Sequence, residues 1–234
     1  WFNSNVMSGY ISQYSLETNE LLNELFVDNM PALLTIDPAN NHLYVSRMMP
    51  MNMGGMTMET DSKMIDQIEY SESGLSIVNQ FMVELNPHAI DISADGQNVY
   101  TISNTNDFIF DIDVNTTDIS STAISELYND NSAIESKYFK TIECVSGLNN
   151  QLFITCQGGI HINSSGEEDA AIKSQVQLWD MDTNSQLDIY EFEVDAMAWH
   201  IAIDTSSERG FVSLSGKSQV RCLSYSGNQF SLEW

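Results

Sequence analysis

Hydrophobic and polar residues alternate along most of the chain, in short runs that end in turn-forming residues. The clearest run, residues 87–103, predicts a strand, a tight turn at Asp95-Gly96 and a second strand. Four segments, this one included, place an aromatic residue eight positions after an aliphatic one: Ile36 and Tyr44, Ile92 and Tyr100, Val145 and Phe153, and Ile203 and Phe211. The hairpins so predicted start 53 to 58 residues apart.

A second kind of strand lies between these inner hairpins. Its five copies alternate apolar with polar residues and run into turns, at residues 11–19, 68–74, 108–113, 176–184 and 220–228. The chain therefore contains one outer strand, followed four times by an inner hairpin and another outer strand.

A mostly-strand unit that recurs at this spacing predicts an all-β fold. We expect a single domain, residues 1–234, that forms a β-propeller of four-stranded antiparallel blades, about four to five in number. The first outer strand, at Ile11, has no hairpin before it. Either the blades are enlarged or the chain is part of a larger ring, and we favour the larger ring.

The same residues carry a family resemblance. Pro87-His88-Ala89-Ile90, Asp95-Gly96 and Val99-Tyr100-Thr101-Ile102-Ser103 resemble the YVTN-type propeller repeat of lactonase-like and surface-layer-associated proteins. Residues 43–46 and 152–155 look like weaker copies, and Leu178-Trp179-Asp180 resembles the strand ending of WD-repeat blades. The resemblance covers most of residues 10–230 and implies the fold, whereas propellers host many unrelated activities.

Three insertions interrupt the repeat. They lie at residues 47–64, which are rich in methionine, at 115–140, with short helical character around 119–128, and at 157–174. Loops at one end of a propeller are the usual binding surface, because the stacked sheets hold them rigidly.

Six of the twelve methionines fall within eleven residues of the first insertion: Met48, Met49, Met51, Met53, Met56 and Met58. Pro50 and Gly54-Gly55 predict a loop there. Soft thioether ligands select Cu(I), so we interpret this loop as a candidate copper site, to which His42 or His88 would add a nitrogen ligand. The spacing is similar to methionine motifs of extracellular and periplasmic copper-handling proteins.

Two other interpretations of the methionines stay open. They form an adaptable apolar surface for a protein partner, or they fold back as core filler. The four histidines form no compact metal signature. His88 and His200 both begin inner strands, which places them near the central channel or leaves them bonded to backbone at a strand end.

The charge narrows the classes of partner. Eight Lys and Arg against 33 Asp and Glu give a net charge of -25, which disfavours binding to nucleic acid or to an anionic membrane surface. No apolar run is long enough to insert in a membrane. The chain begins at Trp1, which suggests a processed or truncated product, and we expect an extracellular, cell-surface or periplasmic location.

Catalytic and redox features are weaker. Gly-x-Ser-x-Gly is absent, and Asp37, Asp91 and Asp204 near the inner strands suit turns or backbone capping better than a metal or base role. Cys144 and Cys156 flank one predicted hairpin, as a cross-strand disulfide or as two core thiols.

The sequence therefore favours a non-enzymatic secreted or cell-surface binding module that binds Cu(I) or docks on a protein partner. The alternatives are a lactonase-like hydrolase with a divalent cation in the central channel, or a structural surface-layer repeat protein.

Overall fold

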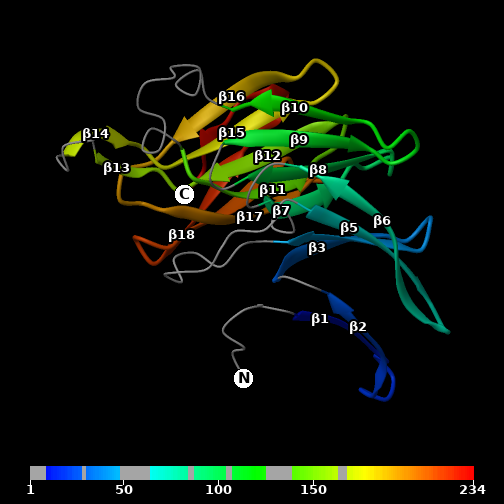
Figure 1. Cartoon of the computed structure of the whole chain (residues 1–234). Coiled ribbons are helices and arrows are strands. Elements are labelled where there is room, and N and C mark those ends of the chain that lie inside the picture. The colour runs from blue at the N-terminus through cyan, green and yellow to red at the C-terminus, as the bar shows by residue number, and fades with distance from the viewer. Residues whose placement is uncertain are drawn as a thin grey trace.

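The computed structural model describes residues 9–27, 30–47, 64–83, 87–103, 107–124, 139–162 and 168–234. These residues form four four-stranded antiparallel sheets and two two-stranded ones, without an α-helix among them. Figure 1 shows β1 and β2 at the lower side of the molecule, apart from the strands of the larger sheets.

The four large sheets are the blades. Blade 1 contains β3 (Pro31–Asp37), β4 (His42–Arg47), β5 (Met64–Ser71) and β6 (Gly74–Met82). Blade 2 contains β7 (Pro87–Ile92), β8 (Asn98–Ser103), β9 (Phe108–Asp113) and β10 (Ile119–Ala123). Blade 3 contains β11 (Thr141–Ser146), β12 (Gln151–Cys156), β15 (Gln175–Asp180) and β16 (Ser185–Glu191). Blade 4 contains β17 (Ala198–Asp204), β18 (Arg209–Leu214), β19 (Gln219–Ser224) and β20 (Ser231–Leu232).

Two two-stranded hairpins lie outside the four blades. β1 (Gly9–Tyr14) and β2 (Leu21–Val27) pair only with each other and form a half-blade that precedes blade 1. β13 (Gly159–Ile162) and β14 (Glu168–Ile172) form a hairpin inserted in blade 3, between β12 and β15. A 3-10 turn, Ser226–Asn228, lies between β19 and β20.

The first strands of successive blades lie side by side around a common centre. β3 packs against β7, β7 against β11, and β11 against β17, although each strand hydrogen-bonds only within its own sheet. This arrangement is a β-propeller of four-stranded antiparallel blades, as the sequence predicts. The half-blade explains why the chain starts with an outer strand.

Three of the four aromatic residues of the repeat are buried between blades, and Phe211 is half-buried. Tyr44 and Phe153 are fully buried and Tyr100 is 1% exposed, each on the second strand of its blade. Tyr44 packs with Ile90 and Val99 of blade 2, and Tyr100 packs with residues of blade 3. Each blade thus supplies half of an apolar layer that only its neighbour completes. This is the physical reason why an aromatic residue recurs on the second strand of these blades.

The connections at one end of the blades are short and share a design. Asp37, Asp113 and Asp180 each end a strand, and one carboxylate oxygen accepts the N–H groups of the second and third residues that follow. The fourth residue after each Asp has a positive φ: 56° at Asn41, 65° at Thr117 and 50° at Asn184. These bonds confirm that the strand-end aspartates belong to turns. We call this side the turn end.

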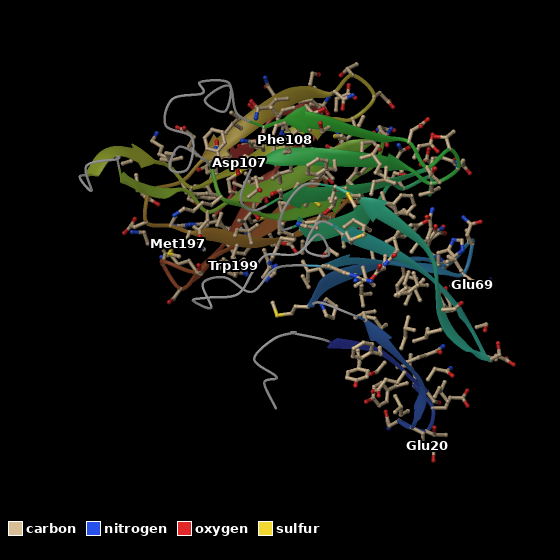
Figure 2. The ribbon with its side chains drawn as sticks, in the orientation of Figure 1. Glu20, Glu69, Asp107, Phe108, Met197 and Trp199 are labelled. Atoms are coloured by element: carbon tan, nitrogen blue, oxygen red, sulfur yellow. The ribbon has the colours of Figure 1, made fainter. Side chains whose placement is uncertain are left out.

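The opposite side, which we call the insertion end, carries every connection of the other kind. Strands β4, β8, β12 and β18 end there, and β5, β9, β15 and β19 begin there. Figure 2 shows Asp107, Met197 and Trp199 toward this end, with Glu20 and Glu69 far from it. The insertions at 47–64 and 157–174 start from β4 and β12, which finish at this end, whereas the segment 115–140 starts at the turn end after β9 and contains β10.

Some local expectations were wrong or incomplete. Residues 119–123 form strand β10 instead of the start of a short helix, because pairing with β9 overrides a weak local pattern. The fourth strands β6, β10, β16 and β20 were not predicted as separate elements, since most of their side chains are exposed or only half-buried.

Candidate functional site

The insertion end near the centre of the propeller holds a linked group of polar side chains. Its members lie within the first three residues of three inner strands: His88 on β7, Glu143 on β11 and His200 on β17. Every inner hairpin has a register shift at this place, between Pro31 and Leu34, Pro87 and Ile90, Thr141 and Glu143, and Ala198 and Ile201. A bulge at a strand start re-aims the side chains beside it. The repeated bulge thus shapes the site.

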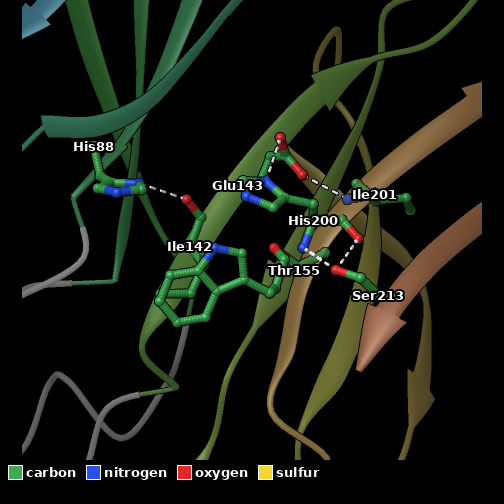
Figure 3. A network of polar contacts seen from close by, with 8 residues as sticks. His88, Ile142, Glu143, Thr155, His200, Ile201 and Ser213 are labelled. Atoms are coloured by element: carbon green, nitrogen blue, oxygen red, sulfur yellow. Dashed lines mark hydrogen bonds and ion pairs between the residues drawn. The ribbon is translucent and has the colours of Figure 1, made fainter. Parts of the chain in front are cut away.

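Glu143 and His200 join blades 3 and 4 (Figure 3). Glu143 Oε1 lies 3.0 Å from His200 Nδ1, and Glu143 Oε2 accepts the Ile201 N–H at 2.5 Å. The Glu143 side chain is 19% exposed and the His200 side chain 55%. Both oxygens of the Glu143 carboxylate therefore already have a partner and are shielded from solvent, whereas the imidazole of His200, which the carboxylate orients, is open to a ligand.

His88 lies on the other side of β11 and is tied to backbone. Its Nδ1 lies 2.7 Å from the Ile142 carbonyl oxygen, so Nδ1 carries the proton and donates it. Burial lowers the pKa of His88, and the nearby His200 lowers it further. The neutral ring then presents Nε2 as an acceptor. Bonding of a histidine to backbone at a strand start, one of the two interpretations from sequence, holds for His88.

The residues around His200 are suited to binding a ligand and do not include an activated nucleophile among those described. The half-buried Trp199 has its ring centroid 6.2 Å from that of His200, edge to face. Ser213 Oγ accepts the His200 N–H at 2.9 Å and lies 3.4 Å from the His200 carbonyl oxygen. The serine hydroxyl thus serves the backbone of His200 and not its imidazole, which leaves it without the activating base that a serine nucleophile needs.

Asp91 occupies the centre of the propeller below this group. Its Oδ1 accepts the Thr35 hydroxyl at 3.0 Å, and its Oδ2 accepts the Ser146 N–H at 2.8 Å. The carboxylate therefore links the inner strands of blades 1, 2 and 3. Asp37 and Asp204 lie far away at the turn end, where they cap turns. The structural interpretation of these three acids fits their contacts.

Asp107 is a buried carboxylate at the insertion end. It has no exposed surface, and it accepts the N–H groups of Phe139 and Thr141, the latter at 3.2 Å, while its carbonyl oxygen accepts the Ile124 N–H at 2.9 Å. Burial raises its pKa to about 6, against the opposing effect of these hydrogen bonds. One residue thus holds both sides of the insertion that separates blades 2 and 3.

The predicted copper ligands are placed unequally. Met48, Met49, Met51, Met53, Met56 and Met58 lie outside the described residues. His88 lies beside the strand that precedes them, since Ser46 Oγ donates to the His88 carbonyl oxygen at 2.6 Å. His42 begins the same strand at the turn end, where Gln67 Nε2 lies 3.1 Å from its Nδ1. His42 and Ser46, the residue of β4 beside His88, are four residues apart on this strand, which is a distance of about 13 Å.

Within the described ranges, no three His, Cys, Asp or Glu side chains converge as a metal site, and no helix is long and apolar enough to cross a membrane. All three cysteines are free and buried. Cys144 pairs with Ile154 instead of Cys156, because the hairpin turn places Ser146 opposite Leu152 and the register runs unshifted from there to Cys144. Burial raises the pKa values of Cys144 and Cys156 well above the ordinary range, so neither is a ready nucleophile.

Glu143 is the site residue that the sequence analysis missed. It stands between two apolar residues, Ile142 and Cys144, in an inner strand, and one charged residue within such a run is the signal that was available. The alternation alone does not show that its side chain reaches His200 on the next blade.

Comparison with known proteins identifies the fold. No family model and no curated protein matches the sequence. Among solved structures, the chain is similar to one from a mitotic checkpoint complex, with a TM-score of 0.66 and 12% identity over 97% of this chain and 59% of that one.

Two lactonase structures are also similar. For the periplasmic gluconolactonase of Pseudomonas aeruginosa the TM-score is 0.65 at 13% identity, over 95% of this chain and 62% of that one. For a putative 6-phosphogluconolactonase of Bacteroides fragilis the TM-score is 0.62 at 8% identity, over 97% of this chain and 63% of that one. The chain spans about six-tenths of the length of these structures, and at such identities the likeness shows the propeller fold alone.

Proposed function

We propose that the protein is a non-enzymatic binding module that receives its ligand at the insertion end. The observation that carries this proposal is the Glu143–His200 pair, which holds an open imidazole at the centre of that end. His88 presents a second acceptor nitrogen nearby, and the described residues that flank the insertions at 47–64 and 157–174 lie at the same end. A rigid scaffold with variable connections at one end is a common design for binding.

The chemistry of the cluster supports binding over catalysis. The Ser213 hydroxyl is engaged by backbone, and the thiols of Cys144 and Cys156 are buried with raised pKa values. The Glu143 carboxylate already has two partners. What remains open is a ring nitrogen on each of two histidines, together with the half-buried Trp199, and these groups recognise a ligand without transforming it.

The first ligand that we propose is Cu(I), bound by the methionines of residues 48–58. Thioether sulfur suits this ion, and a cluster of six in eleven residues supplies three or more donors. Arg47 and Met64, the described residues on either side, belong to strands β4 and β5 at the insertion end, beside His88. We therefore favour His88 over His42 as the nitrogen ligand. A protein partner docked on the same methionines is the competing proposal.

Titration with Cu(I) under reducing conditions tests this directly. The variant with Met51, Met53, Met56 and Met58 replaced by Leu keeps the apolar bulk and removes the sulfur, so Cu(I) binding should be lost. His88→Ala should weaken binding by about tenfold, because one donor is removed. His42→Ala is the matched control and should leave the affinity unchanged.

Equal Cu(I) affinity in the leucine variant would contradict the copper proposal. Retained binding in His88→Ala with loss in His42→Ala would show that our choice of nitrogen ligand is wrong. A chain that binds no Cu(I), but loses a purified partner when the methionines become charged, would assign the surface to protein docking.

Lactone hydrolysis is the second candidate function. It is favoured by the carboxylate-oriented imidazole of His200, which has the arrangement of a general base, and by the fold that this chain shares with lactonases. Hydrolysis of a gluconolactone that is lost in His200→Ala and on treatment with a chelator would support the enzyme. Activity that survives both treatments would exclude this site as its source.

The proposal includes membership of the YVTN-repeat family and a location outside the cytoplasm. The propeller fold and the acidic composition support both, and the similar gluconolactonase is itself periplasmic.

A further inference from the structure

The half-blade has one free edge. β1 pairs with β2 on one side and with none of the described strands on the other. The strands that take the corresponding place in the complete blades, β5, β9, β15 and β19, are paired on both sides. The edge of β1 that pairs with no described strand faces the centre of the propeller, so its N–H and C=O groups form a template for a further strand.

An apolar side chain is exposed next to that edge. Leu34 on β3 is 48% exposed. The residues that take its place in the other inner hairpins are Ile90, Cys144 and Ile201, which are 6%, 2% and 4% exposed. Each of those three is covered by the inner strands of the preceding blade. Leu34 differs because the half-blade that precedes blade 1 contains no inner strands among its described residues.

The surface continues an interface that already exists. Ile11 and Val27 of the half-blade pack against Val45 and Ile68 of blade 1, and this layer is buried. Toward the centre the layer stops at Leu34 and Ile36, of which Ile36 is 50% exposed. Whatever covers these two residues extends the same apolar layer inward.

We propose that the free edge of β1 and the exposed side of β3 bind an antiparallel β-hairpin supplied by polypeptide outside the described strands. The second strand of this hairpin pairs with β1, and its first strand lies beside β3 and covers Leu34. Recognition is by strand addition, in which backbone bonds give affinity and the alternate side chains give specificity.

The pattern within this chain defines the side chains that fit. On β4, β8 and β12 an aromatic residue points toward the following blade: Tyr44, Tyr100 and Phe153. The docking hairpin therefore carries an aromatic residue in its second strand, directed at blade 1. A small or aliphatic residue, such as Ala89 on β7, occupies its first strand.

A second copy of the half-blade does not fit this place. Antiparallel pairing of two β1 edges relates the copies by a two-fold axis perpendicular to the new sheet, which keeps each strand's two faces on the same sides. Both copies of blade 1 would then lie on one face of the sheet. β3 already extends over the space beside β1, so the two blades would collide.

The test tethers a hairpin of known sequence to the full chain. Residues 87–103, the inner hairpin of blade 2, are added ahead of Trp1, with residues 1–8 as the link. In blade 2 only residues 104–107 separate the second strand from the third, so eight residues are long enough. In the matched control, the added copies of Tyr100 and Ile102 are replaced by Asp.

We expect the added hairpin to slow hydrogen exchange of the β1 amides by at least about tenfold and to raise the thermal midpoint, because opening of β1 must then break a second ladder. The Asp-bearing control should show neither change. Leu34→Lys should leave the unextended chain nearly unaltered, and should remove the gain in the extended one.

Equal exchange of the β1 amides in the two extended proteins would overturn the proposal. So would β1 protection in the unextended chain that rises with protein concentration, because that result would assign the edge to a second copy.

Discussion

Asp91 on β7 and Ser146 on β11 are joined across a blade boundary, where the Ser146 N–H donates to Asp91 Oδ2 at 2.8 Å. The other carboxylate oxygen accepts the Thr35 hydroxyl of β3. Since the inner strands share no sheet, one carboxylate replaces the backbone ladder that is missing between them.

Asp91→Asn should therefore lower the free energy of unfolding by about 1–3 kcal/mol, because an amide group can accept at only one of its two atoms and leaves a donor unpaired. Urea unfolding measures the change. Asp118→Asn, at an exposed turn residue, is the control and should have almost no effect. Equal stability of the two variants would refute a linking role for Asp91.

Glu143→Gln tests the orientation of His200. The amide cannot accept at both places now occupied by His200 Nδ1 and the Ile201 N–H, so the imidazole should lose its fixed tautomer. The nitrogen chemical shifts of the His200 ring should move toward those of an exchanging tautomer mixture. The shifts of His88, which is held by the Ile142 carbonyl, should change little. Unaltered His200 shifts would mean that Glu143 does not orient the ring.

The pH dependence of stability should report Asp107. Its pKa in the folded protein is raised to about 6 from 3.8, so the folded state binds this proton more tightly than the unfolded state. The resulting stability is fully present below about pH 4 and is lost as pH rises through 6, by about 3 kcal/mol at about 1.4 kcal/mol per pKa unit.

The measurement compares the wild type with Asp107→Asn by urea unfolding between pH 4 and pH 7. The stability difference, wild type minus variant, should fall across this range. Asp118→Asn, measured in the same way, serves as the control for replacing an exposed carboxyl group by an amide. A wild-type advantage that instead grows with pH would show that the hydrogen bonds to Phe139 and Thr141 outweigh burial.

Thr117 occupies the positive-φ position of a turn at the turn end, a position that suits asparagine better than threonine. Its φ is 65°, a value that disfavours β-branched side chains, whereas Asn19, Asn41 and Asn184 stand at the same place in other turns. Thr117→Asn should raise the free energy of unfolding by about 0.5–1 kcal/mol. The reciprocal Asn19→Thr should lower it by a similar amount, and thermal unfolding of both measures the pair. Changes of the same sign would contradict the argument.

The sequence predicted the inner hairpins well because their pattern reflects burial on both faces. Tyr44, Tyr100 and Phe153 are among the largest fully buried side chains, so their spacing follows directly from blade packing. The outermost strands were harder to predict. β10 exposes its first three residues and has half-buried ones after them, and such a strand owes its existence to pairing with β9.

The candidate site was predictable only in part. His88 and His200 were expected near the centre because strand order alone places the start of each inner strand there. Glu143 was missed because the bulge beside it, between Thr141 and Glu143, depends on packing against neighbouring blades. Cys144 was expected opposite Cys156 for a different reason: the turn places Ser146 opposite Leu152, so Cys144 lies opposite Ile154. The copper-ligand prediction remains a prediction.

The tight Asp-capped reversals at the turn end have a practical consequence for handling the protein. A surface-coupling group placed there, for example on the exposed Asn40 or Asp182, sits on backbone that its own turn already fixes. Immobilised through that side, the molecule would present its opposite side to solution in a uniform orientation, which suits it to sensor chips and single-molecule tethering.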